Sequence, residues 1–163
     1  MPSVAFVLLV VLNISIFNIS GEGSVVVEYL KNDVIVISSR EEVYICDASN
    51  GRYGNLYDGL KLAKEGTFIE IDGVILTHYH SYHAMSINRL ADTCILHSVY
   101  LPKPTSEKET LVMMSIFDAL RDTSTNLYMY ESNAPLEILG GELLASDRAY
   151  SSDYSHPSVA LTY

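Results

Sequence analysis

Three of the chain's five histidines, His78, His80 and His83, fall within six consecutive positions. They follow the apolar run 74–76, which predicts a strand, so they lie in the loop just past a strand end, where functional residues often gather. Neutral imidazole is a preferred zinc ligand, and alternate residues of a tight loop can point two rings toward one metal ion. The spacing indicates a metal site. The alternative interpretation is three loosely packed histidines that bind nothing.

The other side chains that could bind a metal are scattered. His97 lies within an apolar run and is expected to be a packed or edge histidine, and His156 precedes a proline in a polar stretch that predicts an exposed loop. Cys46 and Cys94 each sit in an apolar run, with no Cys-x-x-Cys pair, which predicts two buried thiols rather than a cysteine zinc site. The spacing leaves a disulfide open.

Short β-rich runs and fewer helical patterns alternate around the histidine segment. The runs 24–30, 34–38 and 43–46, joined by polar turns, predict an antiparallel meander. Further strands are expected at 71–76, 94–101, 127–130, 136–139, 142–145 and 159–163. Helices are expected at 55–64, at 85–90 and after Thr105 or Ser106, either of which can cap the helix. This order predicts mixed α/β layering, with helices covering a sheet.

The bulk composition suits one domain with a real core. The chain has 163 residues, nearly half of them apolar, and its formal charge is 10 − 20 = −10. An acidic chain repels phosphate backbones, so the charge argues against nucleic-acid binding by this segment.

The sequence predicts two parts: an apolar membrane helix or leader at 1–20, and a folded domain at 24–163. Residues 1–19 carry no charged side chain and match the roughly 20 residues of one bilayer crossing. We expect a membrane helix at 1–20 that places the protein at a membrane. A signal peptide, and hence an exported protein, is the alternative, although no Lys or Arg precedes the apolar run. A leader buried in the fold is the third interpretation.

The segment Thr77-His78-Tyr79-His80-Ser81-Tyr82-His83, after its strand, resembles the metallo-β-lactamase signature Thr-His-x-His-x-Asp-His. Residues 43–48 look like the family's strand that ends in an Asp before a small-residue turn. Residues 139–143 and 158–161 look like strands of the subgroup attached to competence-type DNA-uptake channels (ComEC-type), whose domain follows a membrane-embedded region. The resemblance spans roughly residues 24–163, and only the histidine loop is specific.

The resemblance implies an αββα sandwich with a dinuclear site, usually zinc. His78 and His80 would serve the first metal ion and His83 the second. Active members hydrolyse phosphodiesters, esters, thioesters or lactams with a metal-activated water. The fold class expected here is therefore α/β (α+β layers), as the N-terminal half of such a sandwich.

Two departures from the family pattern bear on activity. Tyr82 stands where the family has its Asp ligand, and a phenol with a pKa of about 10 is a poor substitute at neutral pH. Tyr163 ends the chain about where the family's strand would lead into a Gly-Asp ligand turn. Conceivable replacement ligands are Asp47, Asp147, Asp153 and His156.

These departures predict a degenerate or truncated member without hydrolase activity and with low zinc occupancy. One alternative is a zinc-dependent hydrolase of phosphodiesters or esters that a missing segment or a partner completes. Another is a membrane-associated interaction protein without metal. A half-sandwich would expose one sheet face, for which we expect self-association or a covering partner.

Overall fold

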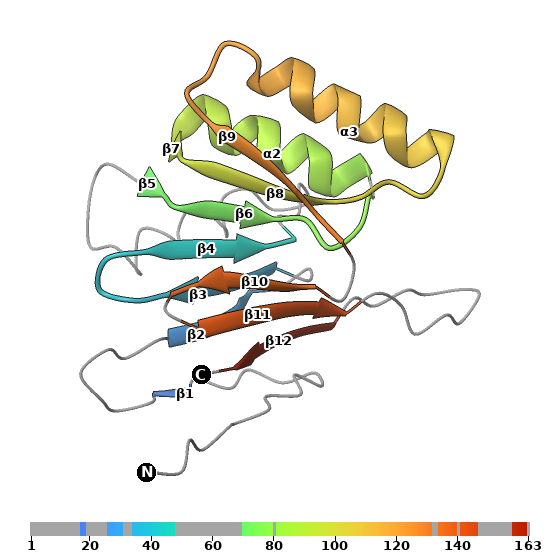
Figure 1. The fold of residues 1–163 in the computed structure, drawn as a ribbon. Helices are drawn as coiled ribbons and strands as arrows, with labels where there is room; N and C mark the ends of the chain where they lie inside the picture. Colours follow the sequence, from blue (N-terminus) through green and yellow to red (C-terminus); the bar gives the residue numbers. More distant parts are fainter. Residues whose placement is uncertain are drawn as a thin grey trace.

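In the part of the chain that the structure describes, the fold has three layers: two helices, a large mixed sheet and a smaller antiparallel sheet (Figure 1). The computed structural model describes residues 17–18, 26–30, 34–47, 70–79, 81–131, 134–139, 141–146 and 158–162. The expected helix 55–64 and residues 1–16, 19 and 20 of the expected membrane helix or leader lie outside these ranges, whereas residues 17–18 of that segment form a short strand. In the described part of the chain, neither helix is long and apolar enough to cross a membrane.

The large sheet has the strand order β1-β2-β3-β4-β6-β8-β9. Its strands are β1 (Phe17–Asn18), β2 (Val26–Leu30), β3 (Val34–Ser38), β4 (Val43–Cys46), β6 (Gly73–Ile75), β8 (Ser98–Pro102) and β9 (Asn126–Tyr130). Strands β1 to β4 are antiparallel, and β4, β6, β8 and β9 are parallel. The predicted meander is therefore confirmed as β2-β3-β4.

Helices α2 (Ser81–Thr93) and α3 (Glu107–Leu120) provide the crossovers between the parallel strands. Helix α3 begins as predicted, because the Ser106 hydroxyl accepts a hydrogen bond from the Glu109 N–H at 3.2 Å. Helix α2 is longer than the predicted 85–90, since its first turn is formed by the end of the histidine segment. Its apolar positions Ala84, Ile87 and Leu90 follow helical spacing and are buried.

The two faces of the large sheet bury different partners, because successive side chains of a strand point to opposite faces. One face, with Val36, Ile45 and Val74, packs against both helices. The other, with Ile37, Tyr44, Cys46 and Ile75, packs against the smaller sheet, whose Ile138 and Leu143 are buried. That sheet consists of β10 (Pro135–Ile138), β11 (Gly141–Ser146) and β12 (Ser158–Thr162).

Two predicted strands are each divided in the structure. The run 71–76 becomes β5 (Glu70–Ile71) and β6, and the run 94–101 becomes β7 (Ile95–Leu96) and β8. Strands β5 and β7 pair with each other in a separate two-stranded parallel sheet. The division at Asp72 comes from contacts with β4, since its carboxylate accepts a hydrogen bond from the Val43 N–H at 2.7 Å and its own N–H donates to the Val43 carbonyl.

Glu137 and Glu142 face each other in the register of β10 and β11, and both are exposed. Glu137 precedes the buried Ile138 on β10, and Glu142 precedes the buried Leu143 on β11, because successive side chains of a strand point to opposite faces. Two carboxylates therefore lie on the described part of this sheet's outer face.

Candidate metal centre

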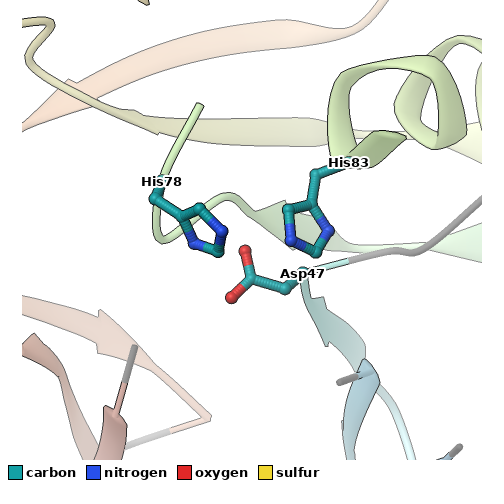
Figure 2. A group of neighbouring side chains, drawn as sticks. All are labelled: Asp47, His78 and His83. Atoms are coloured by element: carbon teal, nitrogen blue, oxygen red, sulfur yellow. The ribbon is translucent and has the colours of Figure 1, made fainter. Parts of the chain in front are cut away.

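Asp47, His78 and His83 point toward one another from three different elements (Figure 2). Their ligand atoms all lie within 4.8 Å of one another. Asp47 follows β4, His78 lies just beyond β6, and His83 sits in the first turn of α2. Over the ranges that the structure describes, they form the one group of three side chains suited to a metal ion.

The parallel pairing of β4 and β6 brings Asp47 to the histidine loop. Cys46 is the register partner of Ile75, and the Asp47 N–H donates to the Ile75 carbonyl at 3.0 Å. The carboxyl ends of both strands thus lie at one edge of the sheet, which is where α/β sheets bind ligands. The site has the position expected of a binding site in this class of fold.

Asp47 turns the chain out of β4 in the left-handed region, with φ at 53°. Aspartate tolerates this conformation better than most residues. Its side chain is only 4% exposed, and a buried carboxylate needs hydrogen-bond donors. The Thr77 N–H donates to Oδ1 at 2.8 Å, and the Thr77 hydroxyl donates to Oδ2. One threonine therefore satisfies both carboxylate oxygens.

The same hydroxyl fixes the proton position on His78. The Thr77 hydroxyl has a single proton, and it goes to the Asp47 carboxylate, which can only accept. The contact of 2.9 Å between Thr77 Oγ1 and His78 Nδ1 must then be donated by Nδ1–H. In neutral His78 the lone pair is left on Nε2, which can bind a metal ion.

Two tyrosines hold the backbone of the loop from the sheet side. The Tyr130 hydroxyl donates to the Leu76 carbonyl at 2.7 Å, and the Tyr79 hydroxyl donates to the Pro102 carbonyl. Burial, and secondarily the charge of Glu109, raises the pKa of Tyr79, so this phenol stays a donor at neutral pH. The loop is fixed on both sides of the histidine that it presents.

His83 is almost fully buried, with 1% of its surface exposed. Its ring stands nearly perpendicular to that of His78, at 85°, with the ring centroids 4.7 Å apart. Neighbouring helix residues Ala84 and Ile87 are anchored in the core, so α2 fixes the position of the His83 backbone.

The structure brings together two of the three predicted metal ligands. His78 and His83 meet, whereas His80 lies outside the described residues, and Tyr82 belongs to the first turn of α2. That His78 and His83 bind a metal ion stays a prediction. Asp47, which the sequence offered only as a conceivable replacement ligand, reaches the group. The signal that could have placed it there is an Asp directly after a buried strand that pairs with the strand before the histidines. Asp147, Asp153 and His156 lie outside the described residues.

The cysteines and His97 take no part in this group. Cys46 adjoins Asp47, but its thiol packs on the opposite face with Ile37 and Tyr44. Burial raises the pKa of the Cys46 thiol far above its ordinary value, and the Asp47 charge raises it further. Cys94 is only half-buried, in contrast to the expected full burial, and both thiols are free. His97 is exposed, 3.7 Å from Glu70.

No protein-family model and no curated protein sequence matches the chain. Several solved structures do resemble it. Zn(2+)-bound PqqB from Methylobacterium extorquens matches with a TM-score of 0.52 and 17% identity, over 70% of this chain and 41% of that one. A candidate metallo-β-lactamase from Thermotoga maritima matches with a TM-score of 0.51 and 14% identity, over 96% and 72%.

The apo chemotaxis sensor ODP from T. denticola matches with a TM-score of 0.54 and 10% identity, over 95% of this chain and 58% of that one. At such low identities these likenesses show the fold alone. The chain has a metallo-β-lactamase fold, which confirms the predicted fold class. It spans less than half the length of PqqB.

Replacing Thr77 by valine tests the hydroxyl that links Asp47 to His78. Thr77→Val keeps the shape of the side chain but leaves Asp47 Oδ2 and His78 Nδ1 without this partner. We expect the free energy of unfolding to fall by about 1–3 kcal/mol, the usual cost of removing one partner of a buried polar group. Urea denaturation measures it. Thr77→Ser keeps the hydroxyl and is the control. Equal stability of the two variants would contradict the proposed linkage.

Proposed function

We propose that this metallo-β-lactamase-fold chain binds one divalent transition metal ion, zinc in the first instance, at Asp47, His78 and His83. We further propose that the ion is bound too weakly for the chain alone to act as a hydrolase. The observation that carries the proposal is the convergence of one carboxylate and two imidazoles within 4.8 Å, at the carboxyl ends of β4 and β6.

The three side chains fit a zinc ion chemically. Two imidazoles and one carboxylate are a known ligand set for catalytic zinc, and this set leaves a fourth position open. His78 offers Nε2, because its Nδ1 proton faces Thr77. Asp47 can accept the Thr77 hydrogen bonds and still offer a lone pair, since each carboxylate oxygen carries two. When bound, zinc would supply Lewis acidity and lower the pKa of a water to about 7.

Two features support weak binding. Zinc holds its nitrogen and oxygen ligands at about 2.0–2.2 Å, so tetrahedral ligand atoms are roughly 3.4 Å apart. The ligand atoms of Asp47 and the two histidines lie within 4.8 Å of one another, a wider limit than a bound zinc ion sets, which supports a loosely arranged site. In addition, Tyr82 stands where the resemblance expects an aspartate. Both features support the interpretation of a degenerate member with low zinc occupancy.

A hydrolase of phosphodiesters or esters, completed by a further segment or a partner, is the second candidate function. It is favoured by the open fourth position that a three-ligand set leaves. It is also consistent with the coverage of the neighbours, since the match extends over 41% of PqqB and 72% of the Thermotoga maritima protein. In that case the missing ligands would come from outside residues 1–163.

Zinc titration of the purified chain tests the proposed site. We expect one weak zinc site per chain, with His78→Ala and His83→Ala each lowering the affinity at least about tenfold, because each removes one of three ligands. Isothermal calorimetry or competition with a chromogenic chelator measures it. His97→Ala is the matched control, since His97 is exposed and lies outside the group. A chain that holds zinc equally well without His78 or His83 would overturn the proposal.

Replacing Tyr82 by aspartate tests the interpretation of a degenerate site. Tyr82→Asp restores the carboxylate of the family pattern, and we expect zinc affinity to rise by about tenfold or more, as an anionic oxygen ligand replaces a neutral phenol. Tyr82→Asn, which has a similar size but no charge, is the control. Metal analysis of the unsubstituted chain showing two tightly held zinc ions would contradict the degenerate interpretation directly.

We also propose that residues 1–20 hold the protein at a membrane, as in the ComEC-type subgroup. The support is the uncharged apolar run 1–19 and the pattern similarity of residues 139–143 and 158–161. Cell fractionation with carbonate extraction tests this. We expect the uncleaved chain in the membrane pellet, and a chain lacking residues 1–20 in the supernatant. An uncleaved chain found wholly in the supernatant would count against membrane attachment.

A further inference from the structure

Strand β9 ends the large sheet with an unusually exposed apolar edge. It is the last strand in the sheet order, and its outer side pairs with no other strand in the described part of the chain. Leu127 is 36% exposed, Tyr128 48% and Met129 50%. Three consecutive residues exposed in this way mean that β9 is uncovered on both faces as well as along its edge.

The edge lacks the features by which proteins normally protect such strands. Sheet edges are usually blunted by lysines, by prolines or by bulges. Residues Asn126–Tyr130 include no charged side chain and no proline. The register with β8 continues without interruption from Asn126 to Tyr130, so no bulge turns the strand away. The edge is open to pairing with another strand.

The backbone directions show which groups are available. The Asn126 N–H donates to the His97 carbonyl at 2.8 Å, and the Tyr130 carbonyl accepts from the Lys103 N–H at 3.0 Å, so these residues direct their backbone groups toward β8. Successive residues of a strand direct these groups to opposite sides. Leu127 and Met129 therefore direct their N–H and C=O groups outward.

From this geometry we infer that a second copy of the chain pairs with β9, in an antiparallel dimer whose two-fold axis passes beside Tyr128. In this register Leu127 of each copy exchanges backbone hydrogen bonds with Met129 of the other. Tyr128 faces its own counterpart in a non-hydrogen-bonded pair. Each outward donor then meets an outward acceptor, and the two large sheets become one.

Charge and side-chain packing favour a second copy as the occupant. The chain carries a net charge of −10, yet the paired segment is neutral, so no like charges lie directly opposite. Glu131, just past the strand, is opposite Thr125 in this register and forms an ion pair with Lys103 at 2.9 Å. Tyr128 already stacks on Tyr100, with ring centroids 5.2 Å apart, and the dimer continues this aromatic row across the axis.

Sedimentation velocity and a site-specific disulfide test the dimer on the full chain. We expect a reversible dimer as the concentration rises from roughly 1 to 100 µM, since a five-residue edge gives a small interface. Tyr128→Lys places two like charges opposite each other and should weaken dimerisation at least about tenfold. Leu111→Lys, at an exposed apolar position of α3, is the matched control and should not weaken it.

Oxidation of Tyr128→Cys tests the register. The two introduced thiols would lie on residues whose Cα atoms are about 4.5 Å apart, within disulfide range, so a disulfide-linked dimer should form. Leu111→Cys should not cross-link comparably. Circular dichroism confirms that each variant is folded. A strictly monomeric chain, a Tyr128→Lys variant that dimerises undiminished, or equal cross-linking through Leu111→Cys would each overturn the inference.

Discussion

The candidate site depends on the buried carboxylate of Asp47. A charge at 4% exposure is tolerated only where donors surround it, and Thr77 supplies two of them from the loop that carries the histidines. Satisfying this carboxylate fixes the loop against the end of β4. It also fixes the proton on His78 through the shared hydroxyl. The position of Asp47 and the tautomer of His78 thus follow from the same requirement.

Much of the fold could be predicted from local pattern. The β-branched runs gave the meander β2-β3-β4, and the Ser106 cap gave the start of α3, because both signals lie within a few neighbouring residues. The divisions at Asp72 and His97 could not be predicted. Each depends on contacts with strands far along the chain, such as the bond from Val43 to Asp72.

The site was predictable in part for the same reason. The spacing of His78 and His83 is a local signal, and the structure brings these two side chains together. Asp47 lies beside the histidines because β4 pairs in parallel with β6. Local sequence periodicity does not predict which strands pair. The histidine loop therefore pointed to the right fold, because its residues lie in the loop that follows β6 and in the first turn of α2.

The distance along the chain between Asp47 and Thr77 has a consequence for how the protein folds. These residues are 30 positions apart, and Tyr130 reaches Leu76 across 54. Closing such long loops lowers the chain entropy before the contacts that stabilise the fold are made. Non-local contacts of this kind therefore form slowly. In a zinc finger the metal drives folding of the chain around it. Here the three candidate ligands come from segments that the pairing of β4 with β6 brings together, so we expect them to converge only as the parallel sheet assembles.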